Sequence, residues 1–225
     1  MIDVADAIRH AYDADHLTRV IYTESHDEVA NGSARVPEEI WPGNADSWHS
    51  KKRSTLGAAL VMTAAGIPML FQGQEFLEDM WFHDGDPVDW DKRGRFPGIV
   101  QLYRDLIRLR RTDPATRGLR GRNSNVFHVN DWDKLVAFHR WADGGPGDDV
   151  VIVANFANRS YAGYRIGFPR PGSWRVRFNS DWSGYDPEFG NHPGFDVDAA
   201  PDPHDGLPAS ASLPIGPYTA LILSQ

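Results

Sequence analysis

Two stretches of the sequence carry side chains that could do chemistry, and the first is the polar run Thr23–Glu28. It directly follows the apolar residues Val20–Tyr22. If these form a strand of an α/β fold, the run lies at the carboxyl end of the strand, where ligands and catalytic groups gather. Ser25-His26-Asp27 has the composition of a nucleophilic triad, but neighbouring residues in an extended segment point apart and cannot converge. The spacing is equally compatible with Ser25 or Asp27 capping a turn or helix.

The second stretch is the acidic segment His83–Asp91. Its carboxylates could bind a hard cation, but the spacing of a calcium loop is absent, which favours an ordinary solvated loop. A later His/Asp set in a Pro/Gly-rich region also lacks ligand spacing, and we expect it to belong to loops. Its members are His192, Asp196, Asp198, Asp202, His204 and Asp205. The sequence therefore predicts neither a metal site nor a cofactor.

The chain contains eight tryptophans, which are large aromatic side chains. Some could stack on sugar rings, whose C–H faces suit an aromatic plane, while most should serve packing. They are Trp41, Trp48, Trp81, Trp90, Trp132, Trp141, Trp174 and Trp182.

The residues up to about 112 are predicted to alternate between helices and short strands. We expect a helix capped by Asp3, a strand at Val20–Tyr22, a loop through Asn44, a helix at about 47–65, a strand at Ile67–Phe71 and a helix at 97–111. The last helix matches the amphipathic template in full. Continuous apolar strands between helices are typical of a parallel sheet buried on both faces. Two strands are too few for a complete sheet, so this part indicates a piece of an α/β domain.

From Asn123 onward the pattern changes to short strands separated by Gly/Pro turns. Strands are expected near Val126, at 134–141, 150–156 and 175–178, and over the closing run 218–223. Such a series argues for an antiparallel β-sandwich. The predicted fold class is α/β followed by all-β, with residues 1–113 and 114–225 as the two domains.

Composition excludes several classes of protein. The 225 residues include 23 Lys and Arg against 31 Asp and Glu, a net charge of −8 that argues against a nucleic-acid partner. With no Cys, the chain has no disulfide framework and no thiol nucleophile. The apolar stretch 56–71 is too short for a membrane span, and the first residues do not form a signal peptide. We expect a soluble protein located in the cytoplasm.

Several motifs resemble the α-amylase superfamily (glycoside hydrolase family 13). Val20–Val29, VIYTESHDEV, looks like the fourth sequence region of that superfamily in the variant typical of 1,4-α-glucan branching enzymes. Gly66–Phe76 resembles the eighth barrel strand and its loop, and Asp86–Trp90 and the Arg-rich helix continue the match. The all-β remainder is similar to the family's C-terminal domain. The resemblance implies the last part of a (β/α)₈ barrel, strands seven and eight, over residues 1–113.

The resemblance also implies roles for two residues. Asp27 matches the acid that stabilises the oxocarbenium-like transition state, and His26 matches a residue that holds the same sugar. The substrate would be an α-1,4-glucan, with a chain segment transferred to a 6-hydroxyl or hydrolysed instead. Retaining glycosidases also need a nucleophile and an acid/base. We find neither family motif for them here, so the chain alone is expected to be inactive.

Two other hypotheses stay open. The chain could be a non-catalytic glucan-binding or trans-complementing module whose barrel piece associates with itself or with an N-terminal barrel fragment, because two parallel strands leave open edges. It could also be a truncated reading frame without independent function.

Overall fold

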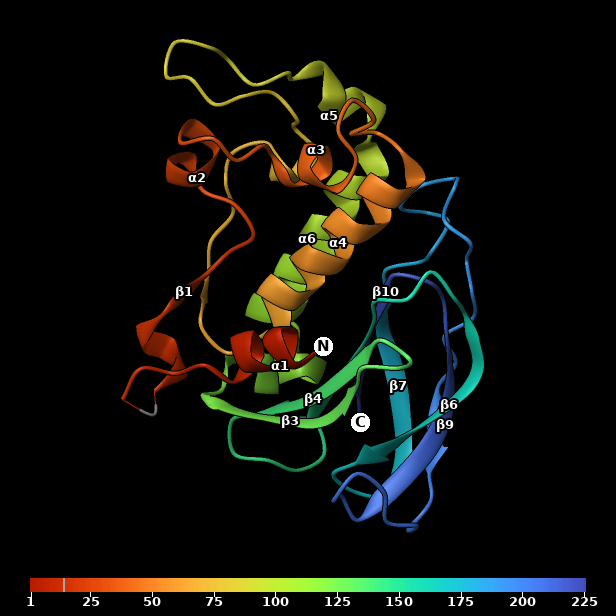
Figure 1. Ribbon diagram of the computed structural model, residues 1–225. Coiled ribbons are helices and arrows are strands. Elements are labelled where there is room, and N and C mark those ends of the chain that lie inside the picture. The colour runs from red at the N-terminus through yellow and green to blue at the C-terminus, as the bar shows by residue number, and fades with distance from the viewer. Residues whose placement is uncertain (14) are drawn as a thin grey trace.

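The computed structural model describes residues 1–13 and 15–225, and its first half is mainly helical (Figure 1). A parallel pair of two-residue strands joins Val20 to Ile67 and Ile21 to Pro68. In chain order the elements are α1 (Ile2–Arg9), η1 (His16–Thr18), β1 (Val20–Ile21), α2 (His26–Ala30), α3 (Val36–Ile40), α4 (Trp48–Thr63), β2 (Ile67–Pro68), η2 (Gln74–Phe76), α5 (Asp91–Arg95), α6 (Pro97–Arg111) and η3 (Pro114–Arg120).

The second half is an antiparallel β-sandwich. Six strands form one sheet in the order β3-β4-β5-β10-β7-β8, and β6 pairs with β9 in a second sheet. The strands are β3 (Asn123–Asn130), β4 (Leu135–Trp141), β5 (Val150–Asn155), β6 (Tyr161–Phe168), β7 (Gly172–Asn179), β8 (Val197–Ala199), β9 (Ala209–Ile215) and β10 (Thr219–Ser224).

The central strands β4, β5 and β10 are buried on both faces, which explains their continuous apolar sequences. Successive side chains alternate between two clusters. Val151 and Val153 belong to the core shared with β6 and β9, whereas Ile152 and Ala154 belong to the core shared with α4 and α6. The large sheet is therefore the middle of three layers, with helices on one side and the β6–β9 pair on the other.

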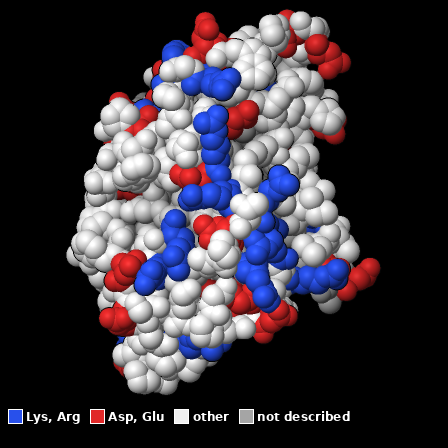
Figure 2. Space-filling view, turned by 180° about the vertical axis from the view of Figure 1, so that it is seen from behind, with Lys and Arg blue, Asp and Glu red and all other residues white. Residues whose placement is uncertain are grey.

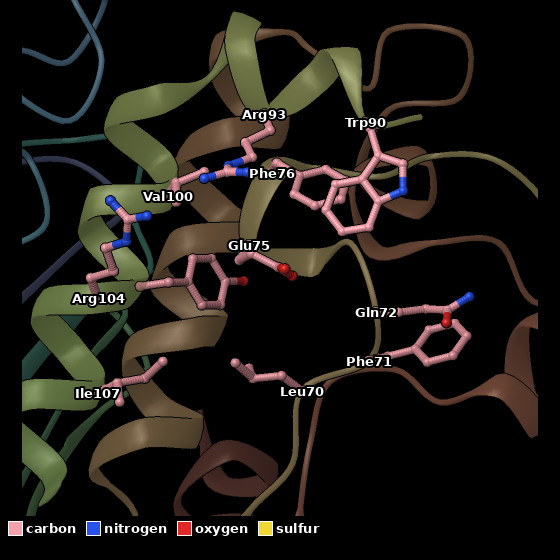
Figure 3. A pocket seen from close by; sticks show the side chains of 11 residues that line it. Leu70, Phe71, Gln72, Glu75, Phe76, Trp90, Arg93, Val100, Arg104 and Ile107 are labelled. Atoms are coloured by element: carbon pink, nitrogen blue, oxygen red, sulfur yellow. The ribbon is translucent and has the colours of Figure 1, made fainter. Parts of the chain in front are cut away.

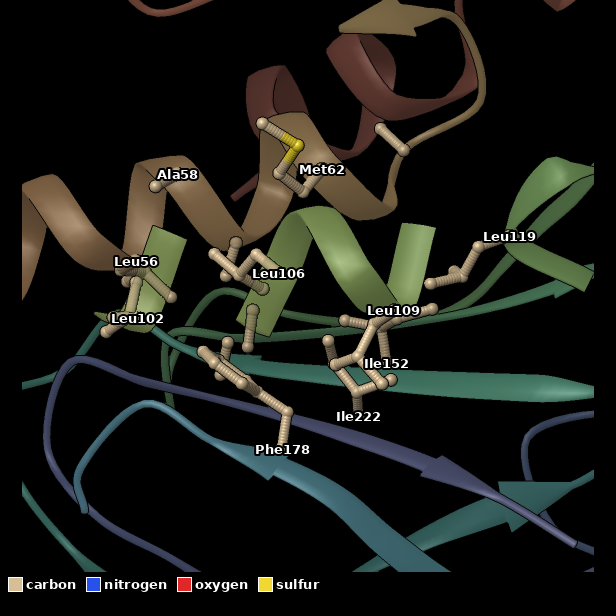
Figure 4. Packing of buried hydrophobic residues seen from close by; sticks show 14 of the residues in the cluster. Leu56, Ala58, Met62, Leu102, Leu106, Leu109, Leu119, Ile152, Phe178 and Ile222 are labelled. Carbon is tan, nitrogen blue, oxygen red and sulfur yellow. The ribbon is translucent and has the colours of Figure 1, made fainter. Parts of the chain in front are cut away.

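Helices α4 and α6 pack against each other and against the large sheet, and α6 turns its apolar stripe into the shared core (Figure 4). Leu102, Leu106 and Leu109 of α6 are almost fully buried, and they share one cluster with Ile152 and Ile222 of the sheet. This core joins side chains from before and after residue 113, so the two predicted domains share a hydrophobic core.

Three arginines cap the C-terminal end of α4, where backbone carbonyls lack helical partners. Arg19 donates to the carbonyl of Ala65 at 2.9 and 3.1 Å. Arg110 donates to the carbonyls of Ala64 (2.9 Å) and Gly66 (2.6 Å), and Arg140 donates to that of Thr63. Burial lowers the pKa of Arg140 and of Arg110.

The longest predicted elements are confirmed, and several short ones were missed. The helix predicted over 97–111 has those bounds, and the helix predicted at about 47–65 spans Trp48–Thr63. The strand predicted at Ile67–Phe71 ends at Pro68 because the chain then turns into η2. The region predicted as a loop through Asn44 contains α2 and α3, and α5 begins at Asp91, where a loop was expected.

Strands β6, β8 and β9 were not predicted, but the antiparallel sandwich is confirmed. None of the helices described in residues 1–13 and 15–225 is long and apolar enough to cross a membrane. On the face shown in Figure 2, Lys and Arg side chains gather in a broad band with Asp and Glu among them, a local departure from the net charge of −8.

Candidate functional site

The site is built on the carboxyl ends of β1 and β2. Because the strands are parallel, the segments that follow them meet on one side of the sheet. Gln74 connects these segments: its amide nitrogen donates to Thr23 Oγ1 (2.6 Å), and its amide oxygen accepts the backbone N–H of Phe71 (2.8 Å). The segments that follow β1 and β2 are therefore joined by direct hydrogen bonds.

A buried ion pair, Glu24–Arg35, lies between the segments that follow β1 and β2. The two side chains are 3 % and 2 % exposed, with Arg35 Nη1 3.2 Å from Glu24 Oε1. Glu24 Oε2 also accepts the backbone N–H of Val36 at 2.6 Å. Arg35 donates to the carbonyl of Gln72 (2.9 Å), and its guanidinium lies 4.0 Å from the centre of the Phe71 ring. The pair thereby ties the segment after β1 to the segment after β2.

Burial raises the pKa of Glu24, while the Val36 N–H and Arg35 act in the opposite direction. Sequence reasoning missed this pair. The two residues stand 11 positions apart in a polar region, and nothing in their spacing distinguishes them from solvated surface charges. Only the folded arrangement brings the two residues together, directly before the segment that carries His26 and Asp27.

His26 and Asp27, the two residues predicted for the site, form the first turn of α2 and point to solvent. Their side chains are 63 % and 78 % exposed, and His26 Nε2 lies 3.2 Å from Asp27 Oδ1. The His26 ring packs edge-to-face on Phe82 with centroids 6.2 Å apart. Asp27 is thus an accessible carboxylate beside a histidine, an arrangement that can bind sugar hydroxyls or stabilise a nearby positive charge.

Ser25 takes the capping role that the sequence left open. Its hydroxyl oxygen accepts the N–H of Glu28 (3.4 Å) at the start of α2 and also lies 3.4 Å from Glu28 Oε2. This agrees with the rejection of a Ser25-His26-Asp27 triad, because Ser25 faces Glu28 instead of His26.

Several grooves border the segments that follow β1 and β2. One of about 410 Å³ lies beside Glu24 and Glu28 and reaches Ile40 and Arg53. Another, of about 420 Å³, lies between α6 and the segment after β2 (Figure 3). In Figure 3, Arg104 and Ile107 stand on the α6 side, and the carboxylate of Glu75 faces the space between the two walls. Neither groove is lined by His26 or Asp27.

The acidic segment 83–91 is largely an exposed loop, as predicted. The buried Glu78 accepts the backbone N–H of Asp89 (2.6 Å) within this segment and that of Met80 (3.1 Å) before it. Within residues 1–13 and 15–225, no group of three His, Asp or Glu side chains is arranged to hold a metal ion. In the later His/Asp set, His192 pairs with Asp181 at 2.7 Å and Asp205 with His128 at 3.0 Å.

One family model matches the second half of the chain. Residues 127–225 match the model of the alpha amylase C-terminal all-beta domain. The predicted resemblance to the α-amylase superfamily is therefore confirmed.

Curated relatives of the chain include 1,4-alpha-glucan branching enzymes GlgB. The enzyme of Frankia casuarinae is 34 % identical over 207 residues, which are 89 % of this chain and 25 % of the relative. That of Mycobacterium tuberculosis is 34 % identical over 89 % of this chain and 27 % of its own length. The chain spans about a quarter of the length of these curated relatives.

Solved structures share the fold of the chain. One is a pullulanase from Anoxybacillus sp. LM18-11, complexed with maltotetraose. The similarity covers 100 % of this chain and 30 % of the pullulanase chain, with a TM-score of 0.69 and 22 % identity. A debranching enzyme from Nostoc punctiforme matches 92 % of the chain with a TM-score of 0.57 and 18 % identity. The helical half and the β-sandwich thus recur together in these proteins.

Proposed function

We propose that this chain is the C-terminal part of an α-glucan-active enzyme of the 1,4-α-glucan branching type. Residues 1–113 would supply the last part of a (β/α)₈ barrel, with β1 and β2 as its seventh and eighth strands, and residues 114–225 the C-terminal domain. The parallel pairing of β1 and β2 supports this assignment. So do the 34 % identity to branching enzymes and the motif VIYTESHDEV around Asp27.

Asp27 would stabilise the oxocarbenium-like transition state. A carboxylate lowers that barrier only while it is ionised and close to the developing positive charge. The exposed position of Asp27 beyond β1 is the observation that carries this proposal. His26, 3.2 Å away, would hydrogen-bond the same sugar. The Glu24–Arg35 pair would act as a positioning element, because it fixes the backbone directly before the two residues.

The chain alone would not catalyse the reaction. Retaining transfer needs a nucleophilic carboxylate and a separate acid/base about 5–5.5 Å apart. Glu24 cannot take either role easily, because it is buried and paired with Arg35. The nucleophile and acid/base would come from barrel strands that precede this region in the branching-enzyme relatives.

Hydrolysis in place of transfer is the alternative within the same class, since the two reactions differ in acceptor sites and water exclusion. A specific observation favours a second alternative, a glucan-binding module completed in trans by an N-terminal barrel fragment. Val20 and Ile67, which pair across β1 and β2, are 50 % and 52 % exposed. A further barrel strand would cover such apolar residues.

The test is an assay of the purified chain on amylose, with iodine staining to detect branching and reducing-end release to detect hydrolysis. We expect no activity from the chain or from its Asp27→Asn variant, both with folded circular dichroism spectra. Activity in the wild-type chain that disappears in Asp27→Asn would mean that the chain carries its own nucleophile and acid/base, and the division of roles proposed above would be wrong.

A further inference from the structure

A further groove lies on the β-sandwich, away from the segment that carries Asp27. It has a volume of about 410 Å³ and lies between β7 and the segment 182–194 that follows it. This volume is in the range of small-ligand sites. Figure 1 shows that segment, light blue, on the side of α4 away from α2. The groove has one open aromatic side chain, Trp182, among polar ones, namely Arg177, Asn179, Asn191 and His192.

Trp182 is held as a flat platform. Its six-membered ring lies directly against Gly184, where any Cβ would overlap the ring atoms. Tyr185 contacts it edge-to-face, with ring centroids 5.0 Å apart at 85°. The residue is nevertheless 49 % exposed. One side of the indole is therefore fixed by packing, and a large part of its surface remains open to a ligand.

His192 is held as firmly as the tryptophan. Its Nδ1 lies 2.7 Å from Oδ2 of Asp181, and its ring packs on Gly190, where a Cβ would overlap it. Asp181 is fully buried and also accepts from Lys52 Nζ (2.6 Å) and from the N–H of Gly190 (3.1 Å). An ionised carboxylate only accepts, so His192 Nδ1 carries the proton. Its Nε2 can exchange a hydrogen bond with a sugar hydroxyl, as acceptor in the neutral ring and as donor in the imidazolium.

The remaining polar side chains are fixed at the same groove. Asn179 donates to the carbonyl of His192 at 2.9 Å, and Arg177 Nε donates to Ser224 Oγ at 2.9 Å. Arg177 has further N–H groups, and the Asn191 amide has its own donors. An aromatic plane beside a small number of fixed planar donors and acceptors suits a sugar ring, which presents apolar C–H faces and a rim of hydroxyl groups.

We propose that this groove binds a segment of an α-glucan, with Trp182 stacking on a glucose ring and His192, Asn191 and Arg177 contacting its hydroxyls. The choice of an α-glucan as ligand rests on the proposed function. The groove would hold the polysaccharide at a point separate from Asp27, so that the sandwich retains a chain while another part of it reacts.

The test is calorimetric binding of maltoheptaose to the purified chain and to three variants. Trp182→Ala should weaken the Kd about tenfold, since one aromatic contact is worth on the order of 1.4 kcal/mol. Trp132→Ala is the matched control, because Trp132 is 87 % exposed in the turn between β3 and β4 and does not line the groove. It should leave the Kd within about twofold. The third variant, Asp27→Asn, reports separately on any binding beside Asp27.

A second measurement does not depend on how the Trp182→Ala variant folds. In the wild-type chain labelled with ¹⁵N-tryptophan, the indole signal of Trp182, assigned with Trp182→Phe, should shift on addition of maltoheptaose. The signal of Trp132 should stay in place. Absence of any binding, or a Kd that changes in Asp27→Asn but not in Trp182→Ala, would overturn the groove proposal. The latter result would leave the proposed role of Asp27 intact, so the two failures are distinguishable.

Discussion

The Nζ atom of Lys52 lies 2.6 Å from Oδ1 of Asp181, and neither side chain is exposed to solvent. The two residues are 129 positions apart, one on α4 and the other just after β7. Lys52 also donates to Thr219 Oγ1 (3.1 Å) and lies 4.8 Å from the centre of the Phe189 ring. This pair joins the helical layer to the sandwich at a point where a surface helix would ordinarily place apolar side chains.

We predict that Lys52→Met lowers the free energy of unfolding by about 3–5 kcal/mol, because it leaves the Asp181 carboxylate buried without its partner. Urea unfolding followed by circular dichroism measures the change. Arg53→Met is the control, since Arg53 is exposed on the same helix, and it should change stability by less than about 0.5 kcal/mol. Equal effects of the two substitutions would refute a structural role for the pair.

Asp181 should also make the stability depend on pH. Burial alone would raise its pKa, but the charge of Lys52 and the hydrogen bonds from His192 hold the pKa of Asp181 below its ordinary value. The unfolded state therefore binds a proton more readily. The stabilisation that ionised Asp181 contributes is complete above about pH 4. It is lost as the pH falls towards the lowered pKa of Asp181 in the folded state. Urea unfolding between about pH 5 and pH 2 should show a shallower decline in Asp181→Asn than in the wild type.

Gly98 tests the contact between α6 and the sandwich. A Cβ at this position would overlap the backbone carbonyl of Tyr185, so Gly98→Ala should cost about 1–3 kcal/mol. At Gly94 in α5, by contrast, no atom lies within 4 Å of the position that a Cβ would take. Gly94→Ala should be neutral or stabilising by up to about 1 kcal/mol. Thermal unfolding of both variants gives the comparison, and an unchanged melting temperature in Gly98→Ala would contradict close packing there.

The exposed residues of β1 and β2 should promote association. Val20 and Ile67 are about half exposed, and both strands are too short to shield their edges. We expect light scattering after size exclusion to give a mass above that of one chain at high concentration. The double variant Val20→Thr/Ile67→Thr should lower this measured mass. Phe195→Ser should not, although Phe195 is also an exposed apolar residue, with 62 % of its surface accessible. A chain that stays monomeric and melts sharply would contradict this expectation.

The fold could be predicted from the sequence wherever one element carries its own pattern. The helix Pro97–Arg111 repeats apolar residues at helical spacing, and β5 is a continuous apolar run, so both were found. Strands β6 and β9 pair with each other, with Tyr164 opposite Leu213. Their sequences contain Gly, Ser and Pro, so apolar and polar residues alternate only weakly along them. Their burial is decided by the sheet opposite them, which local sequence does not contain.

The candidate site was predictable only in part for the same reason. His26 and Asp27 stand in a motif that can be read directly, and Ser25 has the composition of a cap. Glu24 and Arg35 carry ordinary charged side chains whose burial depends on segments from Phe71 to Met80 folding over them. Long-range ion pairs have no signature in a single sequence, because each partner alone resembles a solvated surface residue.

The most direct test of the role assigned to Asp27 is a chimera in which this chain replaces the corresponding quarter of the Mycobacterium tuberculosis branching enzyme. The chimera should branch amylose in the iodine assay, and Asp27→Asn should lower its kcat at least about a hundredfold. Glu28→Gln, which removes the neighbouring carboxylate, should stay within about threefold of the chimera. Retained activity in Asp27→Asn, or a folded chimera without activity, would contradict the account.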